Sequence, residues 1–427
     1  MRLAGLETYR PSTGRFALAA AALCLLAYLP FLQLPLIADD YLQIGLARKY
    51  GSWEGQKVLF ADALYRCRAT SLWVTWLIDR LFGPHSLPLA LFCLFLHLCN
   101  CALVFLFGSW RRIGWPVAAA GALFFAVYEG HQEAVVWISA MPELLVFTFG
   151  TICVIAWMRW LNGNGRGWLV VVYFGFVLAL LSKESAVVVP ALLAIYAYLE
   201  KIPWRRWFAA LAVLGMLAAI YVYFIFVAQR SHLHFNDGTF SLSAPFPWTL
   251  LVSIGRLFWF WGAVALIVGL WSRSAEFRRV GQFATVWIVI TFLPYVFLTY
   301  MPRVPSRHTY WASAGLSLIV GAAIVQGLPR LTDRRVVLAG VAAAIIAHNC
   351  SYLWIKKLGQ YRERARPTEE LLEFSRRSPD PVRVRCFPYG SDIVFYSLEI
   401  AGHRQRSQVE IDPHTAGQAY CFSARED

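Results

Sequence analysis

The feature that most constrains this chain is its series of long apolar runs. A helix needs about 20 apolar residues to cross the hydrocarbon core of a bilayer. Of the 427 residues, 59% are hydrophobic and 15% are charged, whereas about 25% are charged in a typical soluble domain. A single soluble core stops growing at about 250–300 residues, so these runs cannot all be soluble cores. We therefore predict an α-helical polytopic membrane protein, which excludes a nucleic-acid binder despite the formal charge of +14.

The apolar runs divide into eleven predicted transmembrane helices, and the first is expected to be retained because no small-residue cleavage site follows it. Two short spans within 168–199 are separated by a charged turn at residues 182–185. The predicted spans are 16–36, 87–107, about 114–128, about 143–159, the two within 168–199, 207–228, 248–270, 282–300, 309–326 and 336–354.

The positive charges predict the orientation of these spans, because cytoplasmic loops collect Lys and Arg. Sixteen of the 39 cationic residues fall in six segments on one side of the predicted membrane. This places the N-terminus in the cytoplasm and the C-terminus outside. The Arg-rich composition indicates a bacterial source, so the expected location is the inner (plasma) membrane.

Two polar regions lie on the predicted outer side. The first is a large loop, 37–86, and the second is a tail that begins at residue 355. The tail pattern predicts a small extracytoplasmic α/β unit with helices near 367–377 and 391–401 and strands near 382–387, 407–411 and 419–423. The expected division is a transmembrane domain, 1–354, and a tail domain, 355–427. Cys386 and Cys421 could form a disulfide if the tail is outside.

Ionisable residues gather at the predicted outer ends of the spans, and at membrane depth such residues usually mark a site. Carboxylates there suit base or metal chemistry, and cations suit an anionic group such as phosphate. The acids are Asp39, Asp40, Glu129, Glu133, Glu143 and Glu184, and the cations are Lys183, Arg256, Arg303, Arg307 and His308.

Each group also has a plainer interpretation. The pair Asp39-Asp40 could cap the helix that follows it. Lys183 could form an ion pair with Glu184 at the charged turn, and Arg303 and Arg307 could solvate a loop. The sequence lacks the motifs of zinc hydrolases, serine hydrolases and nucleotide-binding loops, so those readings have no support.

Short motifs follow one another in order over residues 16–326. They are Asp39-Asp40-Tyr41, Tyr65-Arg66-Cys67-Arg68, Phe82-Gly83, His97-x-x-Asn100, the run from His131 to Ile138, Glu143-Leu144-Leu145, the run from Leu181 to Ser185, and Arg307-x-x-Tyr310. This series resembles the GT-C superfamily of polytopic glycosyltransferases, in particular bacterial relatives of the transmembrane, TPR-containing protein O-mannosyltransferases. The departures are Ala69 for a proline, Tyr128-Glu129 for a His-Pro pair, Glu143 for an Asp, and the lack of a TPR array, which leaves the acceptor open.

The resemblance implies a hexosyl- or mannosyl-type glycosyltransferase. It would move a sugar, with inversion, from a polyprenyl-phosphate-linked donor to an acceptor hydroxyl at the extracytoplasmic face. Asp39, or secondly Asp40, would be the catalytic base. Glu133 would assist the base, orient the sugar or hold a divalent cation as a cofactor. Lys183, Arg307, Arg303 and Arg68 would bind the donor phosphate. Glu184, Glu143, His131 and His308 would support the site.

The expected partners are the lipid-linked donor, membrane lipids and an acceptor that is a protein, glycan or lipid. Two other classes stay open at this point. A transporter or flippase of an anionic lipid would also need intramembrane charges, although there they would lie near the midplane. A non-catalytic membrane scaffold that presents the tail would leave the charges incidental.

Overall fold

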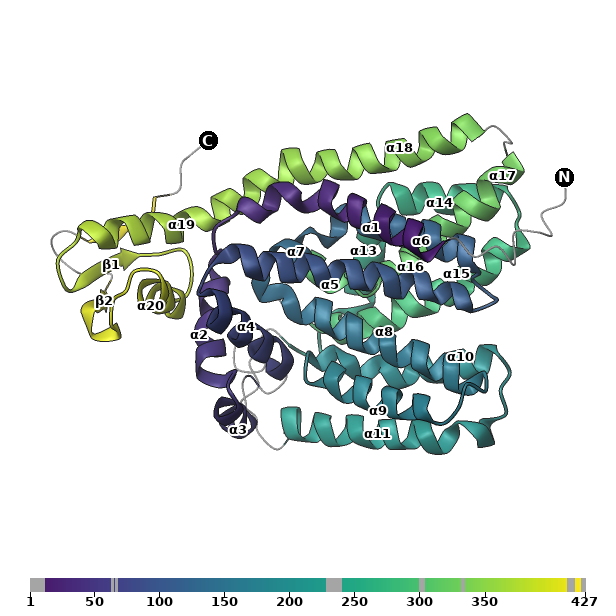
Figure 1. Cartoon of the computed structure of the whole chain (residues 1–427), viewed down its shortest axis with the longest axis horizontal. Helices are drawn as coiled ribbons and strands as arrows, with labels where there is room; N and C mark the ends of the chain where they lie inside the picture. The colour runs from purple at the N-terminus through teal and green to yellow at the C-terminus, as the bar shows by residue number, and fades with distance from the viewer. Residues whose placement is uncertain are drawn as a thin grey trace.

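The structure is a computed structural model that describes residues 12–62, 65, 68–227, 240–298, 304–331, 335–412 and 419–423. It is a bundle of helices that run mostly side by side, with a small α/β unit at one end (Figure 1). The bundle consists of α1 (Thr13–Tyr28), α5 (Ser86–Leu106), α6 (Trp115–Val127), α8 (Met141–Leu161), α9 (Gly167–Leu180), α10 (Val189–Leu199), α11 (Phe208–Val222), α13 (Phe246–Leu257), α14 (Trp261–Trp271), α15 (Ala275–Phe292), α16 (Ser313–Ala322), α17 (Leu328–Leu331) and α18 (Arg335–Ser351).

Short 3-10 and π-helical turns extend or link these helices. They are η2 (Leu29–Gln33), η4 (Phe107–Ser109), η5 (Glu129–His131), η6 (Ile138–Ala140), η7 (Glu184–Val188), η8 (Trp204–Arg206), η9 (Tyr223–Val227), η10 (Leu293–Tyr295), η11 (Ser306–Thr309), η12 (Ala323–Gly327) and η13 (Tyr352–Lys357). The short helix α7 (Gln132–Val136) lies between η5 and η6.

The chain is an integral membrane protein. Among the described residues, five helices are long and apolar enough to cross a membrane: Thr13–Gln33, Ser86–Ser109, Ile138–Leu161, Phe208–Ile225 and Arg335–Arg377. A bent pair, α13 and α14, would make a sixth. Each of the eleven predicted segments contains helix, while the number of crossings stays a prediction.

One predicted span differs from the structure. The straight helix expected over 248–270 is broken into α13 and α14, which meet at an angle of 84°. The break falls at Phe260, whose φ of 57° is left-handed and therefore ends the helical hydrogen-bond pattern. Position 260 itself carries neither glycine nor proline, so the bend has no signal in the residue at which it occurs.

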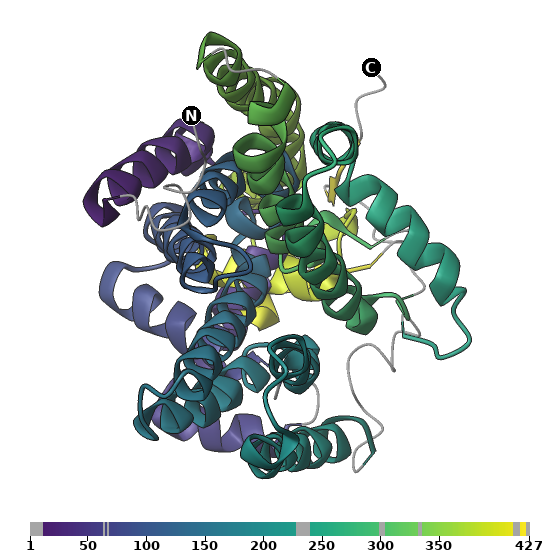
Figure 2. The ribbon, with the colours of Figure 1, turned by 90° about the vertical axis from the view of Figure 1, so that its right-hand side faces the viewer.

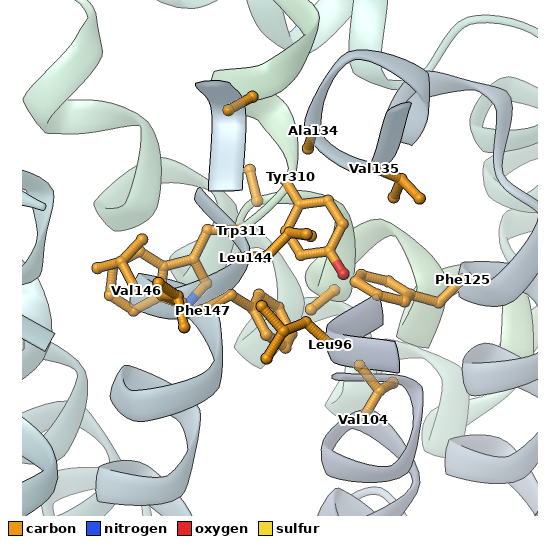
Figure 3. Close-up of a cluster of buried hydrophobic side chains, with 14 of the residues drawn as sticks. Leu96, Val104, Phe125, Ala134, Val135, Leu144, Val146, Phe147, Tyr310 and Trp311 are labelled. Atoms are coloured by element: carbon orange, nitrogen blue, oxygen red, sulfur yellow. The ribbon is translucent and has the colours of Figure 1, made fainter. Parts of the chain in front are cut away.

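Aromatic and aliphatic side chains from α5, α6, α8 and the residues before α16 fill the centre of the bundle (Figure 3). Helices α6 and α16 approach closely because both carry glycine at the contact. A Cβ on Gly121 would lie 2.7 Å from the backbone oxygen of Ser317. In the same core the Nδ1 atom of His97 lies 2.8 Å from the Tyr310 hydroxyl, as expected for a satisfied core histidine.

The predicted outer loop folds into three helices, α2 (Asp39–Tyr50), α3 (Trp53–Ala61) and α4 (Ala69–Phe82). They lie at the end of the bundle that also carries the C-terminal unit, opposite the first turn of α1 (Figure 1). Helix α2 packs directly on the C-terminal unit, because a Cβ on Gly45 would lie 2.2 Å from the ring of Tyr396. The two polar regions therefore form one layer.

The C-terminal unit follows one continuous helix that joins α18, η13 and α19 (Leu358–Arg377). The expected domain boundary after residue 354 falls inside this helix. Beyond it lie β1 (Val382–Cys386), α20 (Ser391–Ile400), η14 (Arg406–Gln408), β2 (Val409–Ile411) and β3 (Tyr420–Cys421). The strands form a parallel sheet in the order β2-β1-β3. The Cys386–Cys421 disulfide joins β1 to β3, so the suggested pairing is present. Figure 2 looks along the bundle and shows this unit behind the helices.

Candidate active site

Asp40 anchors the start of α2. Its buried carboxylate accepts hydrogen bonds from the backbone N–H of Ile37 and of Ser139, both at 2.9 Å, and from the Ser139 hydroxyl at 3.1 Å. Burial raises the pKa of Asp40 to about 7, although these hydrogen bonds oppose the shift. Ala38, the residue just before α2, has a φ of 43°, a strained conformation for alanine. The hydrogen bonds of Asp40 thus link this strained turn to η6, which is a structural role.

Asp39 has a different environment. Its side chain is half-buried, and its carboxylate makes no hydrogen bond or ion pair with any other described residue. Burial raises the pKa of Asp39, while the charges of Arg364, Arg307 and Arg68 act to lower it. The carboxylate thus lies near three positive charges and accepts no hydrogen bond from a described residue, so it is chemically available. Of the acidic pair, the geometry therefore favours Asp39 as the base.

Glu133 holds one of these arginines in place. It accepts hydrogen bonds from the Arg307 guanidinium at 2.8 Å, the Arg307 backbone N–H at 3.1 Å and the Ser306 hydroxyl at 2.6 Å. Burial opposes ionisation, but Arg307 and the Ser306 hydrogen bond hold the pKa of Glu133 below its usual value. Glu133 thus fixes the position of Arg307 relative to α7.

Arg364 is a further residue of the candidate site, and the sequence did not point to it. Its guanidinium lies 4.6 Å from the ring centre of Trp137, and Arg307 lies 5.2 Å from the same ring. The backbone oxygen of Arg364 accepts a 2.7 Å hydrogen bond from the Tyr389 hydroxyl. Glu133, Arg307 and Arg364 all line a pocket of about 210 Å³. Arg364 belongs to α19, which the sequence assigned to a separate tail, and no local motif marks it.

Lys183, Glu143 and His308 form a buried cluster next to this site. Lys183 and His308 both contact the same oxygen of Glu143. The other oxygen accepts a 2.9 Å hydrogen bond from Tyr295, whose ring stacks on His308 with a centre distance of 4.5 Å. The ion-pair partner of Lys183 is therefore Glu143, and not Glu184 as the plainer interpretation had it. Lys183 is only 4% exposed.

The other predicted residues occupy different places. Arg68 lies just before α4, and its charge acts on both Asp39 and Lys183. Glu184 begins η7 directly beside Lys183. His131 is buried in the aromatic core, where its Nε2 atom lies 2.5 Å from the Ser313 hydroxyl. Arg303 lies outside the described residues.

The environment of the Glu133 carboxylate does not favour a bound metal ion. Both of its carboxylate oxygens already accept hydrogen bonds from Ser306 or Arg307. Within the described part of the chain, one set of three ligand-type side chains lies within 4.8 Å of one another, Cys24, His97 and Cys101. That set is in the bundle core, and both ring nitrogens of His97 have protein partners.

The arrangement joins two chemical functions. A carboxylate that is free of hydrogen bonds to described residues can accept a proton, which is what a general base must do. The guanidinium groups around it can bind an oxyanion, and preorganised cations stabilise developing negative charge. Asp39 comes from the start of α2, Arg307 from the turn before α16, and Arg364 from α19. Only the complete fold therefore brings these groups together.

Comparison with known proteins identifies the fold. No family model matches the sequence, and no curated protein matches it. The structure of ArnT from Cupriavidus metallidurans bound to undecaprenyl phosphate aligns with a TM-score of 0.60 at 15% identity, over 91% of this chain and 85% of that chain.

A second similar structure is the archaeal oligosaccharyltransferase AglB from Archaeoglobus fulgidus, in complex with an inhibitory peptide and a dolichol-phosphate. It aligns with a TM-score of 0.52 at 13% identity, over 94% of this chain and 64% of that chain. The same oligosaccharyltransferase in its apo form gives a TM-score of 0.54. At such low identity the likeness establishes the fold alone. The chain therefore has the GT-C fold of ArnT and AglB, as the sequence motifs implied.

Proposed function

We propose that this protein is a membrane glycosyltransferase that uses a polyprenyl-phosphate-linked sugar and transfers the sugar to an acceptor hydroxyl at the extracytoplasmic face. The observation that carries the proposal is that the charges of Arg68, Arg307 and Arg364 all act on the Asp39 carboxylate at one end of a GT-C fold. Lipid phosphates are bound in the similar structures, undecaprenyl phosphate in ArnT and dolichol-phosphate in AglB. We expect a hexose of the mannose type.

The reaction is a single displacement. Asp39 takes the proton from the acceptor hydroxyl, and the acceptor oxygen forms a bond to the anomeric carbon of the sugar. The bond between that carbon and the phosphate oxygen breaks at the same time, and polyprenyl phosphate leaves with the electron pair. Attack from the face opposite to the leaving group inverts the anomeric configuration. General-base assistance of this kind contributes about 10²–10⁴-fold in rate.

The cations act on the leaving group. Arg307 and Arg364 share Trp137 as a stacking partner. Their guanidinium groups can bind phosphate oxygens in a bidentate manner. Glu133 orients Arg307 through its hydrogen bonds, so it is a positioning residue. We also assign Lys183 as a positioning residue, because its ammonium group is buried against Glu143.

The proposal is tested with purified protein in lipid nanodiscs and a radiolabelled polyprenyl-phosphate hexose. We expect release of polyprenyl phosphate and appearance of the sugar with inverted configuration. Arg307→Met should lower the rate by about 10²-fold or more, as for loss of one transition-state donor. Arg362→Gln is the matched control, because Arg362 is exposed on α19. Retention of configuration, or equal rates in wild type and Arg307→Met, would reject the proposal.

A further inference from the structure

Trp137 belongs to the sequence motif that also contains Glu133, and the proposed reaction gives its side chain no role. The centre of its six-membered or five-membered ring system lies 5.2 Å from the guanidinium carbon of Arg307 and 4.6 Å from that of Arg364. The charges of these two arginines both act on the carboxylates of Asp39 and Glu133. One aromatic side chain therefore lies against two of the cations that surround the candidate base.

The two arginines are held in different ways. Arg307 is fixed by its hydrogen bonds to Glu133 as well as by the indole ring. The guanidinium group of Arg364 makes no hydrogen bond or ion pair within the described part of the chain. Instead it lies over the rings of Trp137 and Tyr361, at 4.6 and 5.5 Å. Because a free arginine side chain samples many rotamers, these aromatic rings are what restrict the position of the Arg364 charge.

A contact of this kind leaves the hydrogen-bond donors of an arginine free. A guanidinium group carries five N–H donors in a fixed planar arrangement. A cation–π contact joins its positive charge to the face of an aromatic ring and occupies none of these donors. A carboxylate partner, in contrast, commonly takes up two of them. Arg364 thus has a restricted position and donors that remain open to an oxyanion such as phosphate.

The indole ring itself is held by packing. Trp137 is 8% exposed, and its indole N–H has no hydrogen-bond partner among the described residues. Its backbone is fixed where α7 ends, because its N–H donates to the Glu133 carbonyl at 3.3 Å and its carbonyl accepts from the Ala140 N–H at 2.8 Å. On the same short helix, Ala134 and Val135 are buried beside the aromatic core (Figure 3). The ring is therefore firmly placed, and its aromatic face is the part that contacts the site.

The segment that carries Trp137 also contacts the start of α2, where Asp39 lies. Ser139, two positions later, donates hydrogen bonds from its backbone N–H and its hydroxyl to the Asp40 carboxylate. Glu133, four positions earlier, binds one of the arginines. One short stretch of backbone therefore connects the phosphate-binding cations to the candidate base.

We propose that Trp137 is a positioning residue that presents Arg364, and to a smaller extent Arg307, to the phosphate of the donor. Donors that are in place before the ligand arrives lose less side-chain entropy when it binds. The identity of the ligand rests on the proposed function, whereas the contacts between the indole ring and the arginines rest on the geometry alone.

The test measures binding without turnover, by calorimetry on the protein in nanodiscs. The probe is farnesyl phosphate, a short polyprenyl phosphate, and farnesol is the same chain without the phosphate. Trp137→Leu removes the aromatic face and should weaken binding of farnesyl phosphate by about 10-fold, as expected from the loss of two cation–π contacts. Binding of farnesol should not change. Trp137→Phe keeps an aromatic face and loses only an unpartnered N–H, so its affinity should stay within about 3-fold of wild type.

A double-mutant cycle distinguishes positioning from a general loss of structure. Because Trp137 acts through Arg364, Trp137→Leu should weaken binding by less than about 3-fold further in protein that already carries Arg364→Met. The coupling with Arg307→Met should be smaller, because Glu133 also holds Arg307. Trp53→Leu is the matched control, since Trp53 is 77% exposed in the outer loop, and its affinity should equal that of wild type. Trp137→Met, which also lacks an aromatic ring, serves if Trp137→Leu does not fold.

Four results would overturn the inference. They are no binding of farnesyl phosphate to the wild-type protein, wild-type affinity in folded Trp137→Leu protein, equal losses in Trp137→Phe and Trp137→Leu, and losses that add fully in the double variant with Arg364→Met. Failure of the proposed function is distinguishable from these. It would show as absent sugar transfer by the wild-type protein, while farnesyl phosphate still binds and its affinity still depends on Trp137 and Arg364.

Discussion

Replacing Lys183 by methionine tests whether the buried cluster is a structural unit. Glu143 has Lys183 as its buried cationic partner, and both side chains are at most 5% exposed. Burial and the charge of Lys183 lower the pKa of His308 to about 3, so the imidazole is neutral and cannot replace the lost charge. Removing one member of a buried ion pair typically costs about 3–5 kcal/mol, because the remaining charge stays buried.

This cost predicts a change in thermal stability. The entropy of unfolding is about 2.1 cal/mol/K per residue. For 427 residues, the predicted loss of unfolding free energy divided by this entropy gives a fall in Tm of about 3–6 °C. The double variant Lys183→Met with Glu143→Met should recover most of the loss, since replacing a whole buried pair by apolar residues is often neutral. Thermal unfolding in detergent, followed by fluorescence, measures both.

The control is Lys57→Met, because Lys57 is 61% exposed and pairs only with its exposed neighbour Glu54. Its Tm should stay within about 1 °C of wild type, as for most surface changes. An unchanged Tm in Lys183→Met, or a double variant less stable than the single one, would refute the reasoning. A Lys183→Met protein of normal stability that no longer binds polyprenyl phosphate would return Lys183 to the donor-binding role.

Three further predictions concern other parts of the molecule. Asp40→Asn should destabilise the protein by about 1–3 kcal/mol in a denaturation assay, because an amide cannot accept all three hydrogen bonds, whereas stability unchanged from wild type would contradict the anchoring role. Arg364→Met should move the acidic limb of the pH–rate profile to higher pH, because the base works only when ionised and losing a nearby positive charge raises the pKa of Asp39. A shift of the acidic limb to lower pH would exclude this coupling. Cys421→Ser should lower the stability of the C-terminal unit by about 3–4 kcal/mol, from the loop entropy of a bridge that spans 35 residues, which limited proteolysis would detect as faster cleavage after Arg377.

Much of the fold could be predicted because its physical signals are local. Long apolar runs predict helices wherever they occur, and all eleven predicted segments contain helix. The short strands of the tail were also predicted closely, because alternation in Val382–Cys386 is a local pattern. The bend at Phe260 was not predictable, because the left-handed residue there is neither glycine nor asparagine. The continuous helix from α18 to α19 was missed because its polar second half resembles a separate surface helix.

The candidate site was predicted less completely, because its partners are far apart in the sequence. The sequence indicated the acidic pair. Only the contacts of Ser139 with Asp40 show that Asp40 anchors α2 and leave Asp39 as the candidate base. The ion pair of Lys183 with Glu143 joins residues 40 positions apart, so local spacing pointed to the wrong glutamate. Arg364 follows Asp39 by more than 300 residues, and only the packing of the C-terminal unit against α2 brings the two together.

The most direct measurement of the central claim compares Asp39→Asn with wild type at saturating donor. The exchange keeps the size of the side chain and removes its proton-accepting oxyanion. We expect the turnover rate to fall by about 10²–10⁴-fold while the affinity for polyprenyl phosphate and the Tm stay near wild-type values. Glu54→Gln is the matched control, because Glu54 is an exposed acid in the same outer loop. Wild-type turnover in a folded Asp39→Asn protein would contradict the assignment of Asp39 as the catalytic base.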